Sequence, residues 1–458
     1  MNRLPQEIIK IIIEYDDKLI IILTSLSKQL YSYRKYFRIN IDCNEVNRFK
    51  TEFQIDTLYN IDKLPLPNID KNIFKIKFSN RFNNKINDLP KTISDLSFGD
   101  DFDQGMDDLS ENITGLTFGK NFDKNVDNLP ENITRLIFGT FFDRKVDSLP
   151  KNIKYLTFGY KFNKEINNLP KNITHLTFGL YFNKNVDNLP ENITHLTFGY
   201  NFNKTIDNLP KNITHLTFGH HFNRNVNNLP QSITCLIFGS NFDKKVDNLP
   251  KNVTLLTFGS DFDQKVDSLP QNITTLTFGH YFNQNIDNLP QNITFLTLGE
   301  NFNQTIDYLP EQLTRLTLGD DFNNNLDNLP EKLTWLILGC SFNQKIDNLP
   351  KNLTHLHLSY YFNQTVDCLP KNITHLTFRH CFNQKIDNLP ENITHLTLGH
   401  DFNQKLDNLP KNITHLTLGY RFNQEIEILQ KSITHLNIYI TYKYLQKIYP
   451  NIIFDFEK

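Results

Sequence analysis

Histidines that recur at 20-residue intervals are the side chains whose type and spacing most suggest chemistry. They form two series: His175, His195 and His215, then His355, His375, His395, His415 and His435. Imidazoles brought together by a structural repeat can bind a metal ion or titrate near neutral pH. No carboxylate or thiolate position recurs beside them. We therefore interpret the series as an exposed polar ladder, and predict no metal site and no cofactor.

Aromatic and arginine side chains occupy the positions that vary most within the same 20-residue interval. Exposed Trp, Tyr and Arg side chains are typical of binding hot spots. This pattern predicts a surface that binds a protein target, with the residues Arg135, Tyr155, Tyr160, Tyr200, Phe295, Arg315, Trp335 and Tyr360. The alternative is neutral drift at solvent-exposed positions.

Several function classes are disfavoured. The chain has no Gly-rich phosphate loop, no H-E-x-x-H and no nucleophile elbow, so we predict no catalytic residue and no enzyme activity. A net charge of −2 gives no excess of basic residues of the kind that nucleic-acid binding requires. No apolar stretch approaches the ~18 residues of a membrane span, and no signal peptide is recognisable. Five unpatterned cysteines indicate free thiols in a reducing compartment, which favours the cytoplasm.

The elements that position these residues come from a tandem repeat. Eighteen copies of a 20-residue unit fill residues 71–430 without insertion or deletion, and a partial copy follows to residue 438. One copy, residues 171–190, reads KNITHLTFGLYFNKNVDNLP, and we number the positions of each copy as slots 1 to 20. Slots 3, 6, 8, 12, 16 and 19 are apolar, with Phe at slot 12 in every copy. The alternation at slots 6 to 8 predicts a short strand, which glycine at slot 9 ends in fifteen copies.

Energetics require the copies to stack. Six buried apolar side chains contribute about 10–15 kcal/mol, whereas ordering twenty residues costs about 30 kcal/mol. Each copy must therefore share its apolar faces with its neighbours. Stacking predicts one long parallel sheet, with slot 5 on its exposed concave face and a spine of phenylalanines at slot 12. It also predicts a ladder of Asn and Asp at slot 13 whose side chains satisfy turn amides.

The unit resembles the FNIP repeat, a short relative of the leucine-rich repeat. The Phe-Asn pair at slots 12 and 13, as in Phe182-Asn183, carries the resemblance, together with the Leu-Pro pair at slots 19 and 20. The resemblance covers about four fifths of the chain and implies a leucine-rich-repeat-like solenoid. FNIP arrays are known mainly from social amoebae and giant viruses of amoebae, so the cytoplasm would be the host's if the chain is viral.

The N-terminal segment is similar to an F-box. The family's Leu-Pro-x-Glu-apolar-apolar-x-x-Ile motif is matched here by LPQEIIKII, beginning at Leu4. A later apolar-Ser-Lys-x-Trp motif is met by Leu26, Ser27 and Lys28, with Leu30 where the family usually has Trp. The resemblance implies docking to the Skp adaptor of a cullin–RING ubiquitin ligase through the residues Leu4, Pro5, Ile8, Ile9 and Ile12. The alternative is an amphipathic cap that shields the first repeat.

Together these observations predict an α+β fold that is mainly β. We expect an F-box-like helical segment at residues 1–45, a linker and cap at 46–70, the repeat solenoid at 71–438 and a C-terminal cap at 439–458. The predicted function is target recognition for an SCF-type (Skp–cullin–F-box) ubiquitin ligase. The partners would be the adaptor and an unknown protein, with neither nucleic acid nor membrane involved. The alternative is a binding scaffold with no ubiquitin link.

Overall fold

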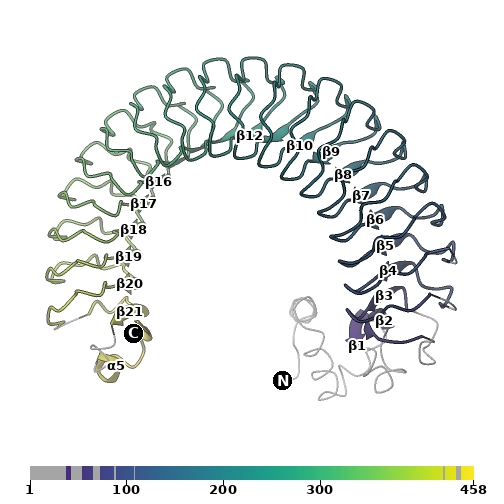
Figure 1. Cartoon of the computed structure of the whole chain (residues 1–458). Helices are drawn as coiled ribbons and strands as arrows, with labels where there is room; N and C mark the ends of the chain where they lie inside the picture. The colour runs from purple at the N-terminus through teal and green to yellow at the C-terminus, as the bar shows by residue number, and fades with distance from the viewer. Residues whose placement is uncertain are drawn as a thin grey trace. The chain divides into compact units, whose positions relative to one another are not determined.

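A computed structural model describes residues 38–42, 54–64, 73–86, 89–107, 109–426, 429–439 and 445–457. The chain forms two compact units. The first runs to Lys204 and includes Asn208–Ile213, and the second takes Thr205–Asp207 and the chain from Thr214 onward. Each unit is a stack of coils with one strand per coil (Figure 1).

The described residues of the first unit contain nine parallel strands, which pair in sequence order. They are β1 (Arg38–Asp42), β2 (Gln54–Ile61), β3 (Lys75–Phe78), β4 (Asp95–Ser97), β5 (Gly115–Thr117), β6 (Arg135–Ile137), β7 (Tyr155–Thr157), β8 (His175–Thr177) and β9 (His195–Thr197). Equivalent slots face each other, as in the pairing of Leu176 with Leu196.

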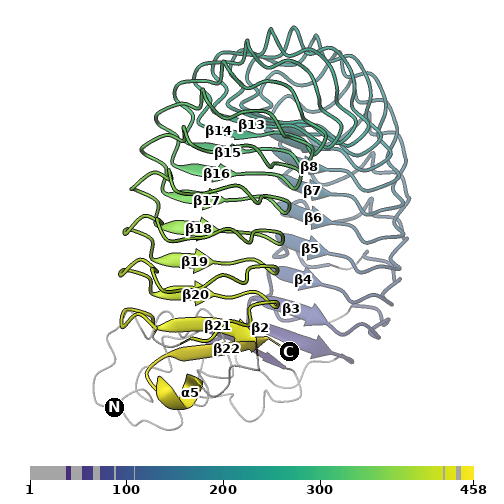
Figure 2. The same cartoon turned by 90° about the vertical axis from the view of Figure 1, so that its left-hand side faces the viewer.

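The second unit repeats this arrangement, and Figure 2 shows its later strands as successive rungs. Its elements are β10 (His215–Thr217), β11 (Cys235–Ile237), β12 (Leu255–Thr257), β13 (Thr275–Thr277), β14 (Phe295–Thr297), β15 (Arg315–Thr317), β16 (Trp335–Ile337), β17 (His355–His357), β18 (His375–Thr377), β19 (His395–Thr397), β20 (His415–Thr417), β21 (His435–Tyr439), α5 (Leu445–Ile448) and β22 (Ile453–Glu457).

The core of each coil is apolar at the predicted slots. In the copy that begins at residue 171, Ile173, Leu176, Phe178, Phe182 and Leu189 are all buried. Rings at slots 8 and 12 of one coil stack at 3.8 Å between centroids, and slot 12 rings of successive coils lie 6.1 Å apart. The predicted phenylalanine spine is therefore confirmed, and it is doubled wherever slot 8 is also Phe.

The Asn/Asp ladder at slot 13 is also confirmed. The backbone N–H of Asn183 donates to Oδ1 of Asn163 at 3.0 Å, and the N–H of Asn203 donates to Oδ1 of Asn183 at the same distance. The same bond recurs in the second unit, for example from Asn403 to Asn383 at 2.9 Å. Each coil thus supplies the acceptor that the turn of the following coil needs.

The α+β prediction is not supported. Within the described part of the chain helix is confined to the four residues of α5, so the fold there is a parallel β-solenoid. Residues 38–42, at the end of the predicted helical segment 1–45, form strand β1 and pair with β2. The F-box-like helices fall at residues 1–36, outside the described residues. No described helix has the length and apolar character that crossing a membrane requires.

Candidate interaction surface on the concave face

Slot 5 side chains of the second unit stack into a continuous row, because parallel strands in register bring equivalent side chains together. We call this row the concave ladder. It consists of Phe295, Arg315, Trp335, His355, His375, His395, His415 and His435, on strands β14 to β21. From Trp335 onward the rings stack at 4.2–4.3 Å between centroids. The strands line the inner side of their coils, so the ladder faces the concave side of its unit (Figure 1).

Arg315 is held between two aromatic rings. Its guanidinium carbon lies 5.3 Å from the Phe295 ring centroid and 5.1 Å from that of Trp335. Both distances are within the range of a cation–π contact. Phe295 keeps 41% of its surface exposed. The sandwich restricts the long Arg315 side chain while leaving its N–H groups available to an acidic or carbonyl-rich partner.

Threonine at slot 4 sets the tautomer of the ladder histidines. Thr374 Oγ1 lies 2.9 Å from Nδ1 of His375 and donates to the backbone oxygen of Thr354 at 3.2 Å. A hydroxyl has one hydrogen to donate. The ring Nδ1 must therefore carry the hydrogen and donate to the hydroxyl, which leaves Nε2 as an acceptor. Equivalent contacts recur at His355, His395, His415 and His435.

The ladder environment disfavours the charged imidazolium. Burial, followed by the charges of neighbouring imidazoles, lowers the pKa of His375, His395 and His415 below its ordinary value. At His355 burial again lowers the pKa most, followed by the charges of His357 and Arg315. The stacked arrangement therefore favours the neutral form of these imidazole rings.

The lowered histidine pKa values predict a pH-dependent stability. Unfolded histidines titrate near pH 6.5 and bind protons before the ladder does, so unfolding becomes easier as pH falls below that value. We expect the melting temperature to drop by a few degrees between pH 7 and pH 5.5, measured by circular dichroism. The triple replacement of His375, His395 and His415 by Gln should flatten the profile, whereas His280→Gln, outside the ladder, should not. A flat wild-type profile would contradict the prediction.

Two other predicted target-binding residues have neighbours in the first unit. Tyr155 on β7 packs against His175, with ring centroids 4.6 Å apart and the rings tilted by 33°. Arg135 on β6 reaches across one coil to form an ion pair with Asp95, and donates to Thr117 Oγ1 at 3.1 Å. Gly115 lies between the pair, where a Cβ would meet the Asp95 carboxylate. Arg135 thus has an intramolecular role that its sequence position did not reveal.

The remaining predicted residues lie at slot 10, in the turn after the strand. Tyr160 and Tyr200 are exposed there in the first unit. Tyr360, in the second, stacks on His380 at 4.5 Å. The structure therefore brings together Phe295, Arg315 and Trp335 in the second unit, and in the first it pairs Arg135 with Tyr155 on neighbouring strands. The three tyrosines at slot 10 lie in the turns of different coils. The predicted adaptor-binding residues, which begin at Leu4, lie outside the described residues.

Sequence reasoning missed two groups of residues. Asparagine at slot 2 donates to a backbone carbonyl of the preceding coil, as Asn172 does to Lys151 at 2.9 Å. The recurrence of Asn at slot 2 in most copies was the sequence signal that could have indicated this structural hydrogen bond. His380, His400 and Asp401 come together at slots 10 and 11 of two coils. Those slots vary between copies, so the repeat pattern itself did not single them out.

One strand per 20-residue coil, a buried apolar ladder and an Asn/Asp ladder define a leucine-rich-repeat-type solenoid. The sequence matches the FNIP Repeat family in fourteen overlapping segments that together run from residue 125 to residue 439. These segments cover more than two thirds of the chain, which therefore belongs to the FNIP repeat family. Residues 71–124 precede the matched segments and include the strands β3 to β5.

Solved structures agree with this assignment. CroV588, described as a novel circular LRR protein, is 33% identical, with a TM-score of 0.65 over 92% of this chain and 81% of that one. YopM from Yersinia enterocolitica WA-314 is 16% identical, with a TM-score of 0.52 over 84% of this chain and 85% of its own, and shares the fold. A comparison with curated protein sequences gave no match.

Proposed function

We propose that this chain is a recognition subunit whose concave ladder binds a protein target and whose N-terminal segment docks a Skp-type adaptor. The observation that carries the target-binding half is the sandwich of Arg315 between Phe295 and Trp335. Trp and Arg are the residue types over-represented at hot spots. A restricted guanidinium loses less conformational entropy on binding than a free one does.

The concave ladder also complements a polypeptide chemically. Arg315 offers donors, and the histidine Nε2 atoms offer a regular row of acceptors beside them. A protein segment carries both carboxylate or carbonyl acceptors and N–H donors, so it can satisfy both parts of the row. The solenoid provides a rigid support, because each coil is packed against its neighbours.

The adaptor half of the proposal is supported by the sequence. The motif LPQEIIKII at residues 4–12 resembles the start of an F-box. In that family the motif docks a Skp adaptor, which links a target held elsewhere in the chain to a cullin–RING ubiquitin ligase. The alternative is a scaffold that binds its target without any ubiquitin link.

One capture experiment tests both halves. The full chain, used as bait, should retain a Skp-type adaptor and a distinct target, both identified by mass spectrometry. Leu4→Asp or Ile8→Asp should abolish adaptor capture and leave the target bound. Arg315→Ala or Trp335→Ala should weaken target binding about thirtyfold, which corresponds to a hot-spot loss of about 2 kcal/mol, and leave the adaptor bound.

Tyr308→Ala is the matched control for the concave face. Tyr308 is 66% exposed and lies in a turn of the coil that contains Phe295, outside the strand. Its replacement should change neither interaction. Loss of target with Tyr308→Ala but not with Trp335→Ala would refute the concave site. Absence of the adaptor from the wild-type capture would favour the scaffold alternative.

A further inference from the structure

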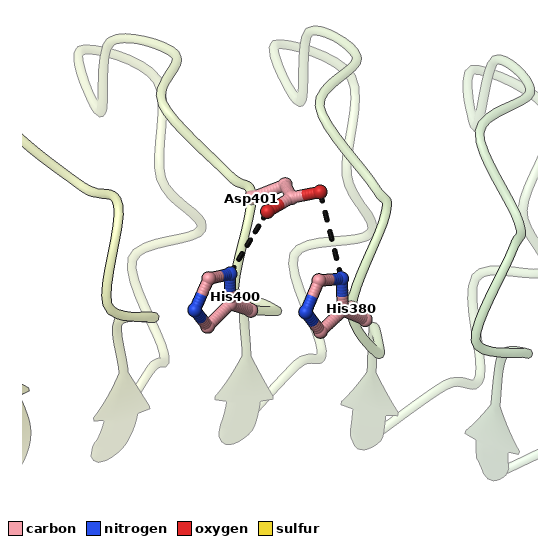
Figure 3. Close-up of side chains that lie close together, drawn as sticks. All are labelled: His380, His400 and Asp401. Carbon is pink, nitrogen blue, oxygen red and sulfur yellow. Dashed lines mark hydrogen bonds and ion pairs between the residues drawn. The ribbon is translucent and has the colours of Figure 1, made fainter.

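Two histidines and one aspartate converge at the rim of the second unit (Figure 3). His380 and His400 occupy slot 10 of successive coils, and Asp401 follows at slot 11. Nδ1 of His400 lies 2.8 Å from Oδ1 of Asp401, and Nδ1 of His380 lies 3.5 Å from Oδ2. The two rings stack at 4.3 Å, 7° from parallel. Both nitrogens therefore point toward one carboxylate that bridges two coils.

These donor atoms have the chemistry and spacing of a metal site. One ligand atom from each residue can be chosen so that all three lie within 4.8 Å of one another. Neighbouring ligands around an ion with bonds of about 2.1 Å lie roughly 3.0–3.4 Å apart, and the observed 2.8 and 3.5 Å bracket that range. Imidazole nitrogen with carboxylate oxygen suits Zn²⁺ and its neighbours in the first transition series.

The cluster is accessible but partly enclosed. The side chains of His380, His400 and Asp401 keep 32%, 35% and 24% of their surface exposed. The hydrogen bond from His400 lowers the pKa of the Asp401 carboxyl most, burial opposes it, and the Arg421 charge adds to the lowering.

Two neighbours tune the site. Cys381 Sγ lies 3.8 Å from Nδ1 of His380, so the thiol is a further donor beside that histidine. Arg421 Nη1 lies 3.3 Å from Oδ1 of Asp401 and competes with a cation for that oxygen. The Arg421 side chain is 64% exposed, so it can turn into solvent when a cation binds.

The concave ladder offers a useful contrast. Its rings stack in the same way, but each Nδ1 contacts a threonine hydroxyl instead of a shared carboxylate. Nδ1 of His280 lies 2.7 Å from the Glu300 carboxylate. The ring that His280 contacts, however, is that of Tyr281 and not a second histidine. Among the residues that the structure describes, His380, His400 and Asp401 are the group of three that can share one ion.

We propose that His380, His400 and Asp401 bind a borderline transition-metal dication such as Zn²⁺, with the Cys381 thiol beside His380 as a further donor. On binding, the hydrogen of each Nδ1 moves to Nε2 through solvent, and the ring turns to aim its freed lone pair at the ion. The ion then fastens two consecutive coils at their rim, independently of what the concave ladder binds.

Cobalt titration of the full chain tests the proposal, because Co²⁺ reports its ligands by absorption. The protein is first freed of metal by chelator dialysis. We expect one equivalent of Co²⁺ to produce visible d–d bands, which one equivalent of Zn²⁺ removes. His380→Gln, His400→Gln and Asp401→Asn should each weaken binding at least tenfold. Arg421→Gln should tighten it, since it removes the competing cation. Cys381→Ser should remove any near-ultraviolet thiolate band.

Matched controls separate this site from the other histidines. His280→Gln and His395→Gln should bind Co²⁺ like the wild type, and all variants should show the wild-type circular dichroism spectrum without metal. Binding should also raise the melting temperature of the wild type but not of Asp401→Asn. Unchanged affinity in Asp401→Asn, or a loss in His395→Gln instead, would overturn the proposal.

Discussion

Replacing Phe242 with alanine is expected to lower the free energy of unfolding by about 3–5 kcal/mol, the usual cost of truncating a buried phenylalanine. Phe242 has 0% exposure. Its ring stacks on Phe238 at 3.8 Å and lies 6.1 Å from both Phe222 and Phe262. The vacated volume cannot collapse easily, because rings from three coils border it. Urea unfolding followed by circular dichroism measures the change as a shift of the midpoint.

Phe295→Ala is the matched control for the spine. The side chain is of the same type, but it is 41% exposed on the concave face. Its truncation should cost less than about 1 kcal/mol, as is usual for surface substitutions, while it weakens target capture. A Phe242→Ala midpoint close to that of the wild type would show that the phenylalanine spine does not support the stack.

Replacing Gly159 with alanine is expected to cost about 1–3 kcal/mol, the range for overpacked sites. A Cβ at this position would lie 1.7 Å from the carbonyl oxygen of Gly139 and 2.4 Å from its carbonyl carbon. Both atoms belong to backbone, so the coils must move apart. Ser359 and Arg379 occupy the same slot in other copies, which shows that such a displacement can be accommodated and keeps the expected cost moderate.

Gly105→Ala provides the control for glycine itself. A Cβ there would meet only the Asp107 carboxylate, at 3.4 Å, an ordinary contact. Removing a glycine also restricts the unfolded chain, so this variant should be neutral or slightly stabilised in thermal melts. Equal effects of the two substitutions would mean that close approach between coils is not the reason for glycine at slot 9.

The repeat made much of the fold predictable. Many copies of one unit allow fixed and variable slots to be compared within a single chain, and buried slots such as those of Leu176 and Phe182 stand out by their constancy. The role of slot 9 was less visible. We expected glycine there to end the strand, but the structure shows that it makes room for the neighbouring carbonyl. None of the described glycines has a positive φ, so the requirement is for space rather than for an unusual backbone conformation.

The sites were harder to predict, because they depend on pairs of copies. Asp95 and Arg135 are two copies apart, and each alone is an ordinary variant of slot 5. His380 and Asp401 are likewise unremarkable within their own copies. Only the register of stacking shows which variable side chains meet. Comparing each slot with the slots of the next two copies, and not only with the consensus, would have found both pairs.

The Asn/Asp ladder at slot 13 has a direction, and the direction affects how the gene can change. Each 20-residue copy presents a side-chain acceptor to the copy after it and a backbone N–H donor to the copy before it, as Asn183 does toward Asn203 and Asn163. A duplicated copy therefore carries both the acceptor and the N–H donor that its two new contacts with neighbouring copies require. Recombination that adds or removes whole copies can therefore lengthen or shorten the array without leaving a slot 13 hydrogen bond unpaired. The surface slots remain free to diversify.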